Sequence, residues 1–128
     1  MSQPEAKLSR DIQRAIKGRG AWCYKVWGNE LTPAGIPDIV GTYRGIFIGI
    51  ETKMPQGKLS TMQKYRIRTI REHGGCVVVA RSVGDALQML THIDQHHFHQ
   101  GEKPWRDDPQ VCSGDPCPYQ GTKDLTKD

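Results

Sequence analysis

The fold of this chain is decided by one stretch of sequence, GIPDIVGTYRGIFIGIETK, which covers residues 35–53. It contains two runs rich in apolar and β-branched residues, 38–43 and 46–53, and only Arg44 and Gly45 separate them. Two residues are the length of a tight hairpin connection, and the second run alternates between two sides as a strand does. We therefore predict a β-hairpin in this stretch.

The register of this hairpin brings two acidic residues together. If Arg44 and Gly45 form the turn, pairing outward from them sets Asp38 opposite Glu51, where Cβ atoms lie ~5 Å apart and like charges are destabilising. A divalent cation such as Mg²⁺ between the carboxylates would turn this repulsion into coordination. Lys53 points to the same side of its strand as Glu51, where an ammonium can hold a phosphate or orient an attacking water. The alternative is an acid and a lysine on the solvent face of an edge strand.

Hydrophobic periodicity and turn signals extend the prediction along the chain. We expect a helix over 2–17, a strand over 21–27, a helix over 60–73, a strand over 76–80 and a helix over 83–96. With the two hairpin strands the order becomes αβββαβα, which is an α/β fold. The fully apolar run 76–80 indicates a sheet covered on both faces.

The formal net charge of +4 is unevenly distributed over the 128 residues. Residues 1–96 hold 14 Lys and Arg against 8 Asp and Glu, whereas residues 97–128 hold 4 against 6. Because periodicity stops near residue 96, we expect one domain over 1–96 and an irregular or partly disordered extension over 97–128. The cationic excess of the first segment fits a nucleic-acid partner, and it also fits ordinary solubility.

Composition argues against several classes of protein. No apolar run approaches the ~20 residues of a membrane span, and the first residues do not have the pattern of a signal peptide. Four cysteines are too few for a disulfide scaffold. These features predict a cytoplasmic protein without a membrane partner.

Histidines and cysteines near the C-terminus include zinc-type ligands. They are His96, His97, His99, Cys112 and Cys117. The cysteines are spaced more widely than in a usual zinc knuckle. We therefore favour a tail that is disordered or contacts a partner over a zinc site.

Two helical faces are basic. The first is formed by Lys7, Arg10, Arg14 and Lys17, and the second by Lys58, Lys64, Arg68 and Arg71. Both are candidates for binding a phosphate backbone, with affinity but without base specificity. The alternative, which we weigh equally, is that they are simply solvated faces.

The motifs together resemble a known family. Gly35-Ile36-Pro37-Asp38, a hairpin, Glu51-Thr52-Lys53, Gly57-Lys58-Leu59-Ser60 and then Gln63 are similar to the VRR-NUC domain of the PD-(D/E)XK nuclease superfamily. The resemblance extends from about residue 5 to residue 93. It implies the αβββαβ restriction-endonuclease-like core, with a central mixed sheet flanked by helices, and this agrees with the order predicted above.

The resemblance also implies a function for these residues. Asp38 and Glu51 would bind Mg²⁺ or Mn²⁺, the carbonyl of Thr52 would be a further ligand, and Lys53 would serve the nucleophilic water. Ser60, next to the second basic face, is a candidate for DNA binding together with the two basic faces. The implied activity is that of a metal-dependent endonuclease.

Two further residues have both a catalytic and a structural interpretation. Glu5 matches the family's glutamate at the start of the first helix, where it completes the metal site, but Ser2 and Glu5 also have the spacing of a capping box. Gln63 shares the inward face of its helix with Ile67 and Ile70, and a buried amide needs partners that the site can supply. We favour the metal-ligand role for Glu5 and a site role for Gln63.

The substrate is expected to be branched DNA, a Holliday junction or a flap, in DNA repair or recombination. Stand-alone domains of this kind occur in bacteria and their phages, so a bacterial cell or phage-infected host is the expected setting. A homodimer is expected because two strands must be cut. The alternatives are a non-catalytic nucleic-acid-binding module on the same fold and a restriction-type duplex endonuclease.

Overall fold

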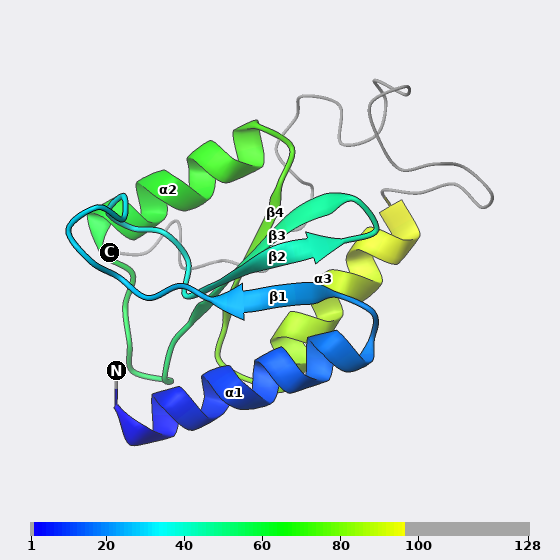
Figure 1. Ribbon diagram of the computed structural model, residues 1–128, viewed down its shortest axis with the longest axis horizontal. Coiled ribbons are helices and arrows are strands. Elements are labelled where there is room, and N and C mark those ends of the chain that lie inside the picture. Colours follow the sequence, from blue (N-terminus) through cyan, green and yellow to red (C-terminus); the bar gives the residue numbers. More distant parts are fainter. Residues whose placement is uncertain (1, 97–128) are drawn as a thin grey trace.

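The computed structural model describes residues 2–96, which form an α/β domain (Figure 1). Its elements are α1 (Gln3–Gly18), β1 (Trp22–Lys25), β2 (Ile39–Tyr43), β3 (Ile46–Thr52), α2 (Thr61–Glu72), β4 (Cys76–Ala80) and α3 (Val83–His96). This is the predicted αβββαβα order. The predicted extension over 97–128, and with it His97, His99, Cys112 and Cys117, lies outside the described residues. His96 closes α3, and its ring centroid lies 4.4 Å from that of His92.

The sheet has the strand order β1-β2-β3-β4. The first three strands are antiparallel and β4 runs parallel to β3, so the sheet is mixed as expected. The hairpin pairs Tyr43 with Ile46, which is the predicted register. Its turn residues have positive φ, 52° at Arg44 and 83° at Gly45, as a two-residue turn between twisted strands requires.

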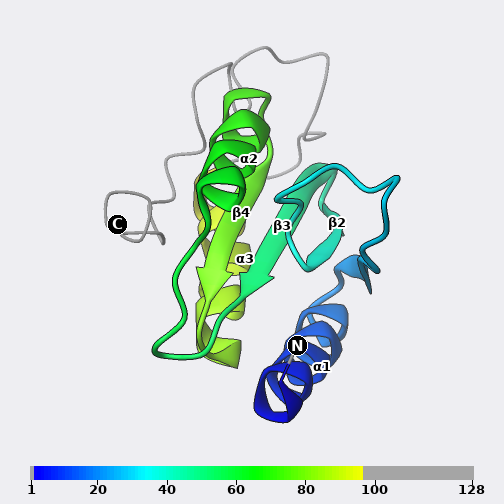
Figure 2. The ribbon, with the colours of Figure 1, turned by 90° about the vertical axis from the view of Figure 1, so that its left-hand side faces the viewer.

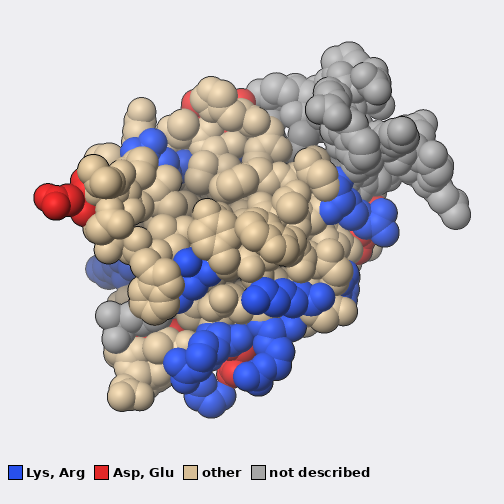
Figure 3. Space-filling model, viewed as in Figure 1, with Lys and Arg blue, Asp and Glu red and all other residues tan. Residues whose placement is uncertain are grey.

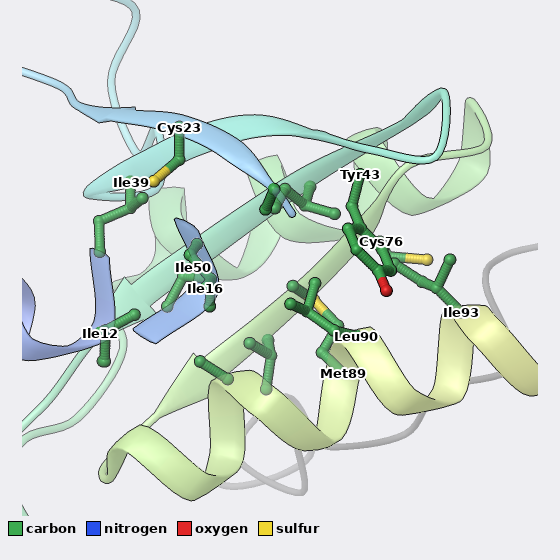
Figure 4. Close-up of a cluster of buried hydrophobic side chains, with 14 of the residues drawn as sticks. Ile12, Ile16, Cys23, Ile39, Tyr43, Ile50, Cys76, Met89, Leu90 and Ile93 are labelled. Carbon is green, nitrogen blue, oxygen red and sulfur yellow. The ribbon is translucent and has the colours of Figure 1, made fainter. Parts of the chain in front are cut away.

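One face of the sheet carries the main core. Figure 4 shows Ile12 and Ile16 of α1 and Leu90 of α3 directed toward strand residues such as Ile50. These side chains are fully buried, because the alternating isoleucines of β3 point to this face while α1 and α3 present apolar stripes to it.

The opposite face is covered less completely. Helix α2 packs on β4 through a smaller cluster of Leu59, Ile67, Val77 and Val79. Figure 2 shows α2 and β4 side by side, with β2 further away. Among residues 2–96, no helix covers the antiparallel edge of the sheet on this face.

Element boundaries differ from the expectations by one or two residues. The strand predicted over 21–27 is confined to Trp22–Lys25, because its pairing with β2 extends only from Trp22↔Thr42 to Lys25↔Ile39. The helix predicted over 60–73 begins and ends inside that range because Ser60 is its N-cap and His73 its C-cap. None of the helices within residues 2–96 is long and apolar enough to cross a membrane.

Candidate active site

Asp38 directly precedes β2 and is held by two hydrogen bonds, one to its backbone and one to its side chain. Its carbonyl accepts from Val26 N–H at 2.7 Å, and its Oδ2 accepts from Thr52 N–H at 3.0 Å. Pro37 packs over Gly49, where a Cβ would lie only 3.0 Å from the proline ring. The missing side chain at Gly49 lets the chain enter β2 close to β3, so the Asp38 carboxylate lies beside the end of β3.

Glu51 is the most deeply buried acid of the site, with 3% of its surface exposed. Its Oε2 accepts from Gln63 Nε2 at 3.1 Å and lies 3.9 Å from Lys53 Nζ. Burial, reinforced by the charge of Asp38, raises the pKa of Glu51 to about 8, although the charge of Lys53 opposes the rise. The pKa of Asp38 is also raised. Burial raises it more than the hydrogen bond from Thr52 and the charge of Lys25 lower it.

Glu5 faces the same site from α1. Its charge raises the pKa of both Asp38 and Glu51, as a nearby carboxylate does. Its backbone N–H donates to Ser2 Oγ at 3.2 Å, so Ser2 caps the helix. Within residues 2–96, no three His, Cys, Asp or Glu side chains gather closely enough to hold a metal ion. Glu5 therefore does not form a preformed three-acid cluster with Asp38 and Glu51.

The donor chemistry of the site fits a hard divalent cation. Glu51 Oε1 is buried and has no hydrogen-bond partner, and such an unsatisfied oxygen is costly unless a cation or water meets it. The groups beside it, the Asp38 carboxylate and the backbone of Thr52, also supply oxygen atoms, the ligands that Mg²⁺ and Mn²⁺ take.

The comparison with protein families decides what kind of domain this is. A family model described as the VRR-NUC domain matches residues 4–84. The chain belongs to the VRR-NUC family. This is a nuclease-type domain of the PD-(D/E)XK superfamily, and it implies DNA as the substrate.

A solved structure titled "VRR_NUC domain" has the same fold. It superposes with a TM-score of 0.59 at 18% identity, covering 76% of this chain and 100% of that one. No curated protein matches the chain. The predicted family and fold are thus confirmed, whereas the roles of individual site residues remain predictions.

The first basic face of this VRR-NUC domain is divided by its ion pairs. Lys7 Nζ lies 2.7 Å from Asp11 Oδ2, and Arg14 approaches the same carboxylate at 3.9 Å. Arg10 and Lys17 instead line a groove between α1 and β1. All four cations are exposed, and Arg10 and Lys17 are the two that line this groove.

The second basic face is smaller than predicted, because Arg71 does not belong to it. Arg71 is 5% exposed and donates from Nη2 to the Val77 carbonyl at 2.8 Å. Arg71 follows the buried Ile67 by four residues and therefore lies on the same, inward face of α2. The sequence prediction overlooked this spacing. Lys58 and Arg68 are exposed and Lys64 is partly buried, while the Ser60 side chain caps α2.

Arg81 is a site-supporting residue that the sequence prediction missed. Its Nη1 donates to the carbonyls of Met54 at 2.6 Å and Gly57 at 3.0 Å, so it holds the loop that follows Lys53. The only signal in the sequence was its position directly after β4, opposite the end of β3.

Proposed function

We propose that this VRR-NUC domain is a Mg²⁺- or Mn²⁺-dependent endodeoxyribonuclease that acts on branched DNA. The observation that carries the proposal is the position of Asp38 beside the end of β3 that carries Glu51. Asp38 Oδ2 accepts from the N–H of Thr52, the residue after Glu51, and Lys53 Nζ lies 3.9 Å from the Glu51 carboxylate. A buried acid and a partly buried acid, both with raised pKa values and beside a lysine, are poorly suited to a purely structural role. Such perturbed groups are typical of catalytic sites.

Each residue has a role that follows from its position. Asp38, Glu51 and the Thr52 carbonyl would hold the cation, with Glu5 completing its surroundings from α1. The bound cation would supply Lewis-acid stabilisation of the charge that develops on the phosphate. Lys53 holds the attacking water against the scissile phosphate.

Gln63 acts on this site as a positioning residue. Its Nε2 donates to Glu51 Oε2, which leaves Glu51 Oε1 directed away from the amide and available to the cation. The exposed cations Lys58 and Arg68, with Lys64, would contact the phosphate backbone.

Branched DNA and a homodimer complete the proposal. A junction is resolved by two cuts on opposite strands, which two copies of one site can make together. Light scattering should give the mass of a dimer at working concentration. The mass of a monomer there would contradict this part of the proposal.

A cleavage panel tests the activity. Four-way junction, flap, single-stranded and duplex DNA are incubated with Mg²⁺, Mn²⁺ or EDTA, and branched substrates should be cut only with a metal. Lys53→Ala and Asp38→Asn should each abolish cleavage while the melting curve stays cooperative. Asp11→Asn, which changes a partly exposed acid on α1 outside the site, is the matched control and should cut normally. Cleavage in EDTA, or by either site variant at the parent rate, would overturn the assignment.

A further inference from the structure

A groove of about 560 Å³ runs between α1 and the edge strand β1. Arg10 and Lys17 line it from α1, and Tyr24, Lys25 and Trp27 line it from β1 and the residues that follow. The groove is separate from the carboxylate pair, and none of its lining residues is acidic. A groove lined by cations and by no acid suits a negatively charged occupant.

Charge indicates one property of that occupant. Arg10, Lys17 and Lys25 form no ion pair with an acid in residues 2–96, in contrast to Lys7, which pairs with Asp11. Figure 3 shows Lys and Arg side chains gathered over α1 and along the neighbouring edge of the sheet. Three cations around one groove without a carboxylate favour a polyanion.

The aromatic side chains indicate a second property. Trp27 is 77% exposed, and Lys25 Nζ lies 5.4 Å from its ring centroid. Tyr24 is half exposed and stacks against the exposed Trp22 in a tilted arrangement, with 5.4 Å between ring centroids. Exposed rings interleaved with cations are the arrangement that binds single-stranded nucleic acid, because unpaired bases offer their faces for stacking. A duplex offers no such faces along its length.

The groove and the active site are linked by one backbone hydrogen bond. Val26, which separates Lys25 from Trp27, donates its N–H to the carbonyl of Asp38 at 2.7 Å. A DNA strand that lies in the groove would therefore pass close to Asp38.

We propose that this α1–β1 groove binds a short run of unpaired nucleotides next to the bond that is cut. Bases stack on Trp27 and Tyr24, and phosphates lie against Arg10, Lys17 and Lys25. The inference rests on the proposed nuclease function, which it deepens by naming the part of the DNA that is recognised. It favours flaps and splayed arms over fully paired junctions.

Binding without cleavage tests the groove. Fluorescence anisotropy in EDTA compares a single-stranded oligonucleotide with a blunt duplex of the same length. Trp27→Ala and Tyr24→Ala should each weaken single-strand binding about tenfold and leave duplex binding within about twofold. Trp27→Phe, which keeps a ring, should restore most of the affinity.

Tyr65→Ala is the matched control. Tyr65 is 52% exposed on α2, and Arg66 lies over its ring at 5.5 Å, so it reproduces the ring-and-cation pair away from the groove. It should not alter the preference for single strands. The proposal would be overturned if Trp27→Ala bound single strands as tightly as the parent, or if it lost as much affinity for duplex as for single strands.

The binding assay and the cleavage panel test the groove and the nuclease activity separately. A parent protein that cuts DNA while Trp27→Ala binds single strands normally refutes the groove alone. A parent that shows the selective binding loss but cuts no DNA with any metal refutes the nuclease activity alone.

Discussion

Gln63 joins the beginning of α2 to the Glu51 carboxylate. Its Nε2 donates to Glu51 Oε2 at 3.1 Å, while its Oε1 accepts from Ser60 N–H at 2.8 Å as part of a capping box. One amide therefore sets both the start of a helix and the orientation of a buried acid.

The two functions of this amide can be separated with Gln63→Glu. A glutamate keeps the acceptor for Ser60 N–H but replaces the donor to Glu51 with another negative charge. Cleavage should fall by tenfold or more, while the helix content measured by circular dichroism is retained. The Mg²⁺ concentration at half-maximal rate should also change. Cleavage at the parent rate would show that Gln63 serves only as a helix cap.

Glu5 and Ser2 distinguish metal binding from helix capping. Ser2→Ala removes the side-chain cap and should cost about 1 kcal/mol of stability without changing the Mg²⁺ concentration at half-maximal rate. Glu5→Gln should raise that concentration and leave urea unfolding nearly unchanged. If Glu5→Gln instead loses stability with unaltered metal dependence, Glu5 is a structural residue.

Glu51 should make the metal-free protein less stable at alkaline pH. Its pKa rises from 4.5 in the unfolded chain to about 8 in the fold, because of burial and then the charge of Asp38. Between these values the unfolded chain releases a proton that the folded chain keeps, so stability is complete below about pH 4.5 and falls as the pH rises to about 8.

Urea unfolding in EDTA at several pH values measures this effect. The loss between pH 5 and pH 8.5 should be on the order of 3 kcal/mol. Glu51→Gln should flatten the profile and be the more stable protein at the higher pH. An equally steep profile in Glu51→Gln would place the titrating group elsewhere.

Arg71 should act on stability and Arg68 on DNA binding. Arg71→Ala leaves the buried Val77 carbonyl without its donor and should cost about 2 kcal/mol. Arg68→Ala, three residues earlier and exposed, should change stability by less than about 0.5 kcal/mol and lower the salt slope of DNA binding by about 1. Chemical denaturation measures the stability of both variants, and binding at several salt concentrations measures the salt slope. A loss of stability in Arg68→Ala with a lower salt slope in Arg71→Ala would contradict the assignment.

Gly35 lets the loop before Asp38 lie against α2. Its φ is +81°, and a Cβ would collide with the carbonyl of Met62. Gly35→Ala should therefore cost about 2 kcal/mol or more, with cleavage falling as Asp38 moves. Gly28→Ala, where a Cβ would meet nothing within 4 Å, is the control and should be near neutral in thermal melts.

The sequence by itself determined the order of the elements and the register of the hairpin. The Arg44-Gly45 turn and the alternation of β3 are local signals, and a register follows from its turn, so Asp38 and Glu51 could be paired without coordinates. The motif spacing was specific enough to predict the family before any comparison.

Tertiary structure alone decided the surroundings of those residues. How deeply Glu51 is buried, which charges reach Asp38 and what meets Arg71 depend on how α2 and the loops pack over the sheet, and that packing joins residues far apart in the chain. The groove beside β1 also exists only because an edge strand lies against α1, which leaves Tyr24 and Trp27 exposed among cations. Local periodicity predicts which side a residue faces, but only packing determines what lies there.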